Sequence, residues 1–389
     1  MKNNITIFFS VIIICTLYSF SMVKKNISSS NDIVSSESIT IAIGGDWDDK
    51  WGPDGATELN LKKGSSHDLI LMLGDLSYDG IDNDFNYNIQ NAKNWASKAN
   101  KVVGNTPMLF VAGDHDSKSQ DGDIMTYAET LNFPDGKKAV HPPTGKLLGH
   151  HYEGKYPYLW FNDIVKGENK VRIVATSVAF QESNTEPTEM QKYLKFQYAV
   201  GSENYKWVEA VYADAQEKGY WIIHINHLPW IDMGKNQSFV NSQGMIDLAS
   251  KYNVNVLLTA SSHNIWRTKP LKINETTCTS IALTTSASGA NPNCVGNQNN
   301  KIYKKTDGLI QAHVGVAGKT SGLNLEKYPD ACDPNTDGEV RHYLADSTCV
   351  TDAITGIVTL TIKKEYLSGD FLKTDGSLFE PYSFIIKSH

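Results

Sequence analysis

Residues that commonly bind metal ions follow five short apolar segments of this chain. They are Asp46, Asp75, Asp114, His227 and His263. Each of the three aspartates follows a glycine, and a single Gly-Asp pair is also an ordinary turn at the end of a strand. Ligands of open α/β sheets gather in the crevice outside the carboxyl ends of the strands. If the carboxyl ends of these strands lie along one edge of the sheet, here called the rim, these carboxylates and imidazoles come together there.

Carboxylates and imidazoles form the ligand set of borderline or hard cations such as Zn, Mn, Fe or Mg. Tyr78 lies three residues after Asp75 and can reach the same ion as a phenolate, a ligand that favours trivalent iron. The alternative is that the ring of Tyr78 only packs. We expect a metal centre on this rim.

The elements that must carry these residues alternate along the chain. Apolar runs predict buried strands at 39–43, 68–73, 106–112, 170–176, 220–225 and 254–260. Helical spacing occurs between them, as in 85–103 and 204–219. This alternation predicts a layered α/β domain.

Two long stretches, 117–168 and 269–349, show little helical spacing, and we interpret them as insertions or loops over one edge. The tail from 356 to 386 alternates apolar and polar residues around the turn Asp375-Gly376. This pattern predicts a closing hairpin.

Five motifs occur in order along the chain. They are GDWD (45–48), GDLSY (74–78), GDHD (113–116), NHLP (226–229) and SSHN (261–264). The series resembles the motifs of the purple, or tartrate-resistant, acid phosphatases, which are binuclear metallophosphoesterases. The versions in that family read GDxG, GDxxY, GNH[DE], a His followed two places on by Pro, and GHxH. The resemblance covers roughly residues 39–270, and five motifs in order are specific where each alone is weak.

The resemblance implies a fold, a domain organisation and two metal sites. A calcineurin-like metallophosphoesterase domain would span 39–389, as a four-layer sandwich of α/β (α+β-like) class with two mixed β-sheets flanked by helices. The first site would hold Fe through Asp46, Asp75, Tyr78 and His263. The second would use the bridging Asp75 with Asp114, His227 and Ser261.

The second site departs from the family pattern at two positions. Asp114 replaces an asparagine and adds a negative charge. Ser261 replaces a histidine, and a serine hydroxyl is a poor metal ligand at neutral pH. The register at Ser261 is fixed, because residues 252–264 keep the family's spacing without a gap. We expect a second site that takes Zn, Mn, Fe or Mg, that binds weakly, or that is absent.

The resemblance also implies hydrolysis of a small phosphomonoester or a phosphoprotein by a pair of cations. His115 would act as general acid or phosphate ligand, with Asp116 orienting its ring. The loop 230–244 lacks the histidines that the family carries there. Lys235 is a candidate for the positive charge in their place, the alternative being an ordinary solvated loop lysine. The glycine-rich run 313–322 lacks Walker spacing, and we interpret it as a structural turn.

Two functions follow from these motifs. The first is a metal-dependent acid phosphatase of the purple type. The alternative is a weak or inactive phosphatase-like protein used for binding or scaffolding, as in the glideosome-associated proteins, and Asp114 and Ser261 motivate it. The sequence retains Tyr78, His115, His227 and His263 together, and this favours the acid phosphatase over the scaffold.

Composition limits the partners and predicts export. A net charge of -7 with 40% hydrophobic residues indicates a globular protein without the broad basic surface that nucleic acid requires.

Residues 1–22 contain a short charged start and an apolar run, which predicts a secretory signal peptide or an uncleaved signal anchor. No second hydrophobic span follows. Residues 23–38, rich in Ser and Asn, predict a flexible linker.

The cysteines agree with export. Loss of Cys15 with a leader leaves four, and these allow three connectivities, including the local pairings Cys278–Cys294 and Cys332–Cys349. Glycosylation sequons occur at Asn26, Asn236 and Asn274. We expect a glycoprotein of the secretory pathway that is extracellular, vacuolar or lysosomal.

Overall fold

The parts of the chain that the structure describes fall in one unit, Ser38–His389. This computed structural model describes residues 38–79, 85–117, 122–132, 145–147, 150–177, 198–231, 242–274, 276–283, 291–320, 343–345 and 354–389. Some of the predicted features lie outside these residues. They are the leader, the linker up to residue 37, Lys235, the sequons at Asn26 and Asn236, and the cysteines Cys332 and Cys349.

The first of two mixed sheets contains seven strands in the order β11-β15-β14-β13-β1-β2-β3. Their bounds are Ile302–Lys304, Phe384–Lys387, Tyr366–Lys373, Gly356–Ile362, Ile39–Gly44, Leu69–Met72 and Met108–Phe110. Strands β1, β2 and β3 are parallel, whereas β13, β14 and β15 form an antiparallel meander beside β1. The short strand β11 is parallel to β15 at the edge.

The second sheet contains eight strands in the order β10-β12-β9-β8-β7-β6-β5-β4. Their bounds are Ile265–Arg267, Ile310–Val314, Val256–Thr259, Trp221–Ile225, Asn169–Thr176, Leu159–Lys166, His150–Lys155 and Gly145–Leu147. Strands β7, β8, β9 and β12 are parallel to one another. The flanking strands pair antiparallel.

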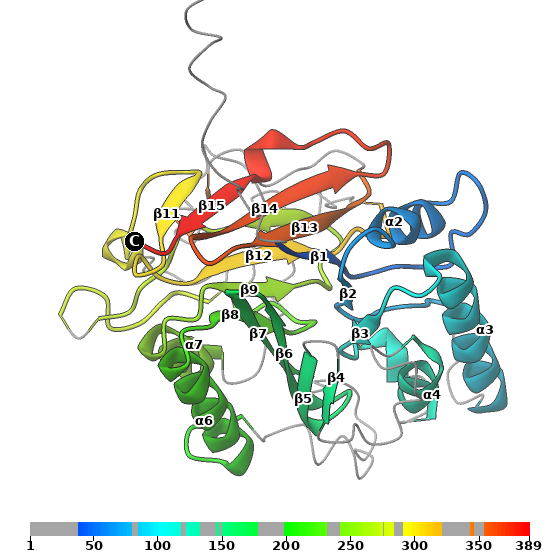
Figure 1. Cartoon of the computed structure of the whole chain (residues 1–389), viewed down its shortest axis with the longest axis horizontal. Helices are drawn as coiled ribbons and strands as arrows, with labels where there is room; N and C mark the ends of the chain where they lie inside the picture. The colour runs from blue at the N-terminus through cyan, green and yellow to red at the C-terminus, as the bar shows by residue number, and fades with distance from the viewer. Residues whose placement is uncertain are drawn as a thin grey trace, which may run out of the picture. The chain divides into compact units, whose positions relative to one another are not determined.

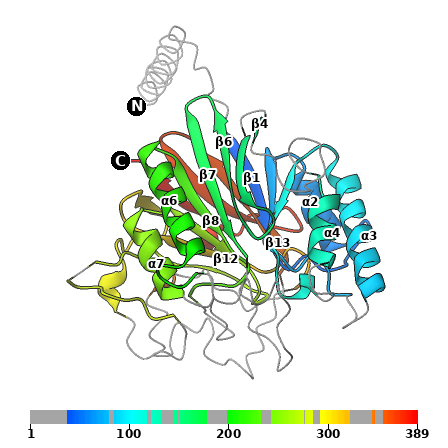
Figure 2. The same ribbon diagram turned by 90° about the horizontal axis from the view of Figure 1, so that it is seen from below.

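Helices cover the outer faces of both sheets, as Figures 1 and 2 show. On one side lie α2 (Ala56–Gly64), α3 (Phe85–Val103) and α4 (Gly122–Thr130). On the other side α6 (Glu203–Glu217) packs against β7 and β8, next to α7 (Ser242–Lys251). The sheets meet through β1 with β6 and β13 with β7. The expected four-layer sandwich of two mixed sheets and flanking helices is therefore confirmed.

Apolar side chains fill the space between these layers. All residues of β2, β8, β9 and β12 are buried, as expected for strands with cover on both faces. One buried polar side chain inside the layers, that of Arg172, forms ion pairs with its neighbours. The guanidinium of Arg172 on β7 donates to Asp163 on β6 at 2.6 Å and to Asp214 on α6 at 2.7 Å. This network joins a helix to two strands of the sheet below it.

Two sequence interpretations of long stretches were wrong. The stretch 117–168 contains α4 and the strands β4, β5 and β6, and 269–349 contains β12 between β9 and β10. Strand β12 was missed because Gln311 and His313 break its apolar pattern. Both are buried, and their polar atoms bond to Ile231 and Thr259. The tail forms two successive hairpins, β13–β14 and β14–β15, rather than one.

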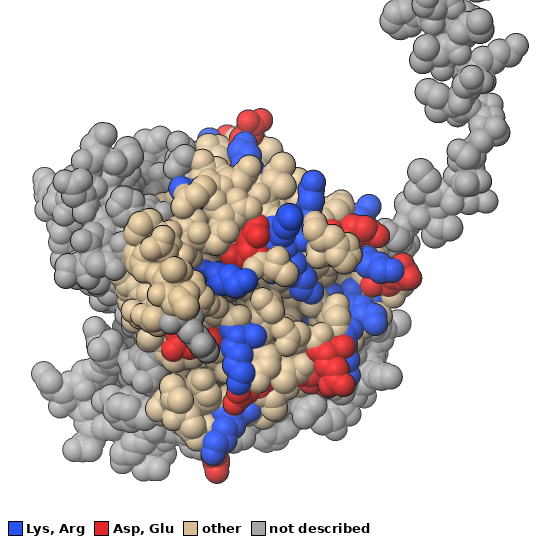
Figure 3. All heavy atoms as spheres, turned by 90° about the vertical axis from the view of Figure 1, so that its left-hand side faces the viewer, with Lys and Arg blue, Asp and Glu red and all other residues tan. Residues whose placement is uncertain are grey.

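The face of the unit that carries the C-terminus mixes both signs of charge. Figure 3 shows Lys and Arg side chains lying among Asp and Glu side chains there. One such pair joins Lys364 to Glu168 at 3.2 Å. Surface pairs of this kind contribute little to stability. Within the described residues, no helix is long and apolar enough to cross a bilayer.

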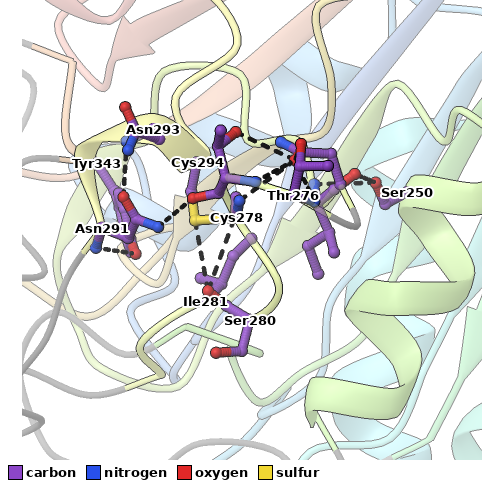
Figure 4. The surroundings of a disulfide bond; sticks show 12 residues. Ser250, Thr276, Cys278, Ser280, Ile281, Asn291, Asn293, Cys294 and Tyr343 are labelled. Atoms are coloured by element: carbon purple, nitrogen blue, oxygen red, sulfur yellow. Dashed lines mark hydrogen bonds between the residues drawn. A yellow bond between two sulfur atoms is a disulfide. The ribbon is translucent and has the colours of Figure 1, made fainter.

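A disulfide between Cys278 and Cys294 closes a loop next to β10, as expected for one of the two local pairings (Figure 4). The side chain of Asn274 organises the same loop, because its Oδ1 accepts the backbone N–H groups of Thr276, Thr277 and Cys278. The N–H of Ile273 donates to Ser250 on α7. The loop is thus tied to α7 and to η2 (Pro292–Cys294).

We expect the combined change Cys278→Ser and Cys294→Ser to lower the free energy of unfolding by about 3 kcal/mol. A crosslink across a loop of this length lowers the conformational entropy of the unfolded chain, and this loss raises the free energy of unfolding by about that amount. Chemical denaturation of both proteins under oxidising conditions measures the difference. The exposed neighbour Thr279→Ser is the matched control, and equal stability of the double variant and the wild type would contradict the expectation.

Candidate metal centre

The five predicted metal-binding residues lie on loops at the carboxyl ends of strands from both sheets. Asp46, Asp75 and Asp114 follow β1, β2 and β3 of the first sheet. His227 follows β8 of the second sheet, and His263 lies between β9 and β10. The rim is therefore formed where the strand ends of the two sheets approach each other.

A first cluster of donor atoms surrounds the hydroxyl of Tyr78. This oxygen lies 2.6 Å from Oδ1 of Asp46, 2.9 Å from Oδ2 of Asp75 and 2.9 Å from Nε2 of His263. Nε2 of His263 lies 3.1 Å from Oδ1 of Asp46. The structure thus brings together all four residues expected at the first site.

A second cluster adjoins the first through Asp75. Nε2 of His227 lies 3.0 Å from Oδ1 of Asp114 and 3.5 Å from Oδ1 of Asp75. Asp75 therefore presents Oδ2 to the first cluster and Oδ1 to the second, as a bridging carboxylate does. Nδ1 of His227 lies 2.6 Å from the carbonyl oxygen of Leu73, and donation to that oxygen leaves Nε2 as the ligand atom.

Ser261 lies beside the first cluster. Its backbone N–H donates to Oδ2 of Asp46 at 2.8 Å, and the residue is buried. A serine here supplies an N–H to the cluster, where the family pattern has an imidazole. Asp75, Asp114 and His227 supply two carboxylates and one imidazole to the second cluster, and a nitrogen of His115 also lies near the two carboxylates.

Four residues of the site have left-handed backbone conformations, which non-glycine residues rarely adopt. The φ angles are 57° at Asp46, 52° at Asp75, 80° at Ser261 and 46° at His263. Each such conformation costs on the order of 1–3 kcal/mol and persists only where the surroundings fix it. The concentration of these angles here indicates that the loops are shaped for the site.

Asp116 has a different role from the one expected. It was expected to orient the ring of His115, but it is buried and accepts hydrogen bonds from three backbone N–H groups. Oδ2 accepts from Asp75 at 2.7 Å and Gly113 at 2.8 Å, and Oδ1 accepts from Leu76 at 2.8 Å. Because both oxygens are used in this way, Asp116 ties the loop after β2 to the loop after β3.

The electrostatics of the site favour a bound cation. Burial raises the pKa of Asp46, but the charges and hydrogen bonds of His263, His227 and Tyr78 together hold that pKa below its usual range. Desolvation also opposes ionisation of Asp114, whose side chain is 49% exposed, but the hydrogen bond and charge of His227 with the charge of His115 lower the pKa of Asp114 to about 2. Burial and the charges of Asp46 and Asp75 hold the pKa of Tyr78 well above 10. Crowded carboxylates with two imidazoles and a phenol fit a cation of hard or borderline character.

His115 lies at the solvent side of the centre. Its backbone N–H donates to Oδ1 of Asp75 at 2.9 Å, and its ring lies 4.5 Å from the ring of Tyr78. The side chain is 38% exposed, and its Nε2 is 3.8 Å from Oδ2 of Asp114. The imidazole can therefore contact both solvent and a molecule bound at the clusters.

The glycine-rich run that was interpreted as a structural turn packs directly against two of the candidate metal ligands. A Cβ on Gly315 would lie 2.8 Å from Oδ2 of Asp46 and 3.0 Å from the nitrogen of His263. The N–H groups of Gly318 and Lys319 both donate to the carbonyl oxygen of Asp46 at 2.9 Å. Sequence reasoning missed this contact, although the glycines signalled a close backbone approach.

Comparisons with known proteins agree with this geometry. The sequence profile of the calcineurin-like phosphoesterases matches residues 39–264. Among solved structures, purple acid phosphatase PPD1 from yellow lupin (Lupinus luteus) seeds is similar, with a TM-score of 0.58 and 17% identity. The likeness covers 91% of this chain and 54% of the lupin protein, so this chain spans about half the length of that protein.

A second similar structure is GAP50, described as the anchor in the inner membrane complex of Plasmodium. Its TM-score is 0.53 at 11% identity, and the likeness covers 90% of this chain and 89% of GAP50. Identities this low support the fold alone. No curated protein sequence matches the chain.

We expect Asp116→Asn to lower the free energy of unfolding by about 2 kcal/mol or more. The amide replaces one acceptor oxygen with an NH2 group, which leaves a buried backbone N–H unsatisfied. Denaturant titration with a chelator present measures this loss independently of metal binding. The exposed Asp54→Asn is the control and should stay within about 0.5 kcal/mol of wild type; equal losses in the two variants would argue against the role of Asp116.

Proposed function

The chain belongs to the calcineurin-like phosphoesterase family, and on that basis we propose that it is a metal-dependent acid phosphatase that hydrolyses phosphate monoesters. The observation that carries the proposal is the convergence of Asp46, Tyr78 and His263 around one point, with Asp75 bridging to His227. Four chain segments that are distant in sequence supply these donors, because Asp75 and Tyr78 lie in the same loop after β2.

We propose different cations for the two sites, on the chemistry of their donor atoms. Asp46, Asp75, Tyr78 and His263 would hold iron, because a phenolate is a ligand for Fe(III). Asp75, Asp114 and His227 would hold Zn, Mn, Fe or Mg, less tightly because Ser261 supplies no imidazole. When bound, such a pair supplies positive charge for a phosphate ester and lowers the pKa of a bound water.

The residues of the chain then have separate tasks. His115, at the exposed side, donates a proton to the leaving oxygen or contacts the phosphate. Asp116 acts as a positioning residue, since it fixes the backbone of the two loops that carry Asp75 and His115. His227 is held by Leu73 so that its Nε2 faces Asp75 and Asp114.

The proposed substrate is a small phosphomonoester or a phosphoprotein, and the proposed location is the secretory pathway. The apolar leader pattern and the sequons support export. The bond between Cys278 and Cys294 also supports it, because disulfides persist in oxidising compartments.

A second candidate is a phosphatase-like protein used for binding or scaffolding. Asp114 and Ser261 favour it, because both changes fall on the second site. The similarity to GAP50, described as an anchor, agrees with such a use of the fold. In that case the site would retain its geometry with little or no turnover.

Metal analysis combined with an assay on an aryl phosphate between pH 4 and 8 tests the enzyme directly. We expect turnover with iron in the first site and a visible colour from phenolate-to-Fe(III) charge transfer. Tyr78→Phe should remove the colour, whereas the exposed Tyr87→Phe should keep it. Absence of turnover with any of Fe, Zn or Mn would rule out the enzyme, and stoichiometric iron without colour would rule out Tyr78 as a ligand.

The combined change Asp114→Asn and Ser261→His separates the two candidates. We expect an active wild type, and a double variant that binds the second cation roughly tenfold or more tightly because it regains an imidazole. Metal titration followed by the same assay measures both quantities. An inactive wild type with an active double variant would instead support the second candidate.

A further inference from the structure

Lys319 lies against the ring of Tyr78. Its Nζ is 3.8 Å from the centroid of that ring and 3.4 Å from Oδ2 of Asp48. The side chain is 27% exposed, so the ammonium group is partly shielded from water. An ammonium at this distance over an aromatic face is attracted by the ring, the more so where water is partly excluded.

The backbone places Lys319 in this position through the loop that carries Asp46. The N–H groups of Gly318 and Lys319 donate to the carbonyl oxygen of Asp46, and the N–H of Ala317 donates to that of Gly45. A Cβ on Gly318 would collide with the carbonyl oxygen of Trp47. Backbone contacts therefore fix how closely the two segments approach.

The charge of Lys319 complements its surroundings. The hydroxyl of Tyr78 faces Asp46 and Asp75, whose negative charges oppose a phenolate at that position. A positive charge on the ring face offsets part of this repulsion. The second contact of Lys319, with Asp48, keeps the ammonium over the ring instead of free in solvent.

We propose that Lys319 is a positioning residue of the metal centre, which holds the ring of Tyr78 in its ligand position. This inference rests on the proposed function in one respect, that Tyr78 is a metal ligand. The ammonium acts through Tyr78, since its contacts are with the ring and with Asp48.

The chain offers a matched control in Lys50. Its Nζ lies 3.8 Å from the same Oδ2 of Asp48, and it donates to Thr320 at 3.4 Å. Lys50→Met thus removes a lysine from the same carboxylate, and comparison with Lys319→Met isolates the contact with the ring of Tyr78. Lys319→Arg retains a cation that can stack on the ring.

The experiment has a metal-free and a metal-bound measurement. The metal-free protein is labelled with ring-13C tyrosine, and the NMR signal of Tyr78 is assigned through its loss in Tyr78→Phe. This signal should shift or broaden in Lys319→Met and should keep its wild-type position and width in Lys50→Met.

In the iron-loaded protein, Lys319→Met should bind Fe(III) roughly three- to tenfold more weakly. Its charge-transfer band should move to longer wavelength, because the phenolate electrons lose a stabilising charge. Lys319→Arg should restore both properties.

The outcomes distinguish the two proposals. If the wild type binds no metal, the proposed function fails, and the Tyr78 signal alone decides the role of Lys319. If Lys319→Met keeps the wild-type signal, iron affinity and band, the role of Lys319 is overturned while the proposed function stands. Circular dichroism checks the fold of each variant, and Lys319→Gln replaces Lys319→Met if the latter does not fold.

Discussion

The structure of this protein depends on holding several carboxylates close together where water is largely excluded. Asp46 and Asp75 are buried, and both contact the hydroxyl of Tyr78. Two like charges 4 Å apart repel by about 4 kcal/mol at an effective dielectric constant of 20. Without cations, His227 and His263 offset part of this repulsion through contacts of 3.5 Å or less. Cations offset it more fully, so the arrangement is best explained as a binding site.

Backbone contacts make this arrangement possible. The site residues occupy left-handed conformations that cost free energy, and hydrogen bonds between neighbouring loops hold them there. Asp116 ties the loop after β2 to the loop after β3, and the run around Gly315 packs behind Asp46 and His263. Hydrogen bonds of the polypeptide itself therefore hold the candidate ligand atoms in this arrangement.

Sequence reasoning predicted β1, β2, β3, β7, β8 and β9 because these strands are largely apolar runs, and it predicted α3 from its helical period. Strands β5 and β6 contain polar residues that interrupt the apolar pattern, and β12 contains Gln311, whose partner Ile231 is distant in sequence, so a local pattern could not identify these strands. The candidate ligands Asp46, Asp75, Asp114 and His227 were predictable as a cluster, since each follows a strand. The roles of Asp116 and Lys319 were not, because they arise from contacts between loops that only the folded chain brings together.

The ligand loops come from both sheets, β1 to β3 on one side and β8 and β9 on the other. A cation that binds donors from the two sheets acts as a clamp across the seam of the sandwich. Its binding then raises the free energy of unfolding of the two-sheet sandwich, because an ion that binds only the native state stabilises that state by mass action. Supply of metal in the surroundings would in this way set the lifetime of the fold as well as its chemistry.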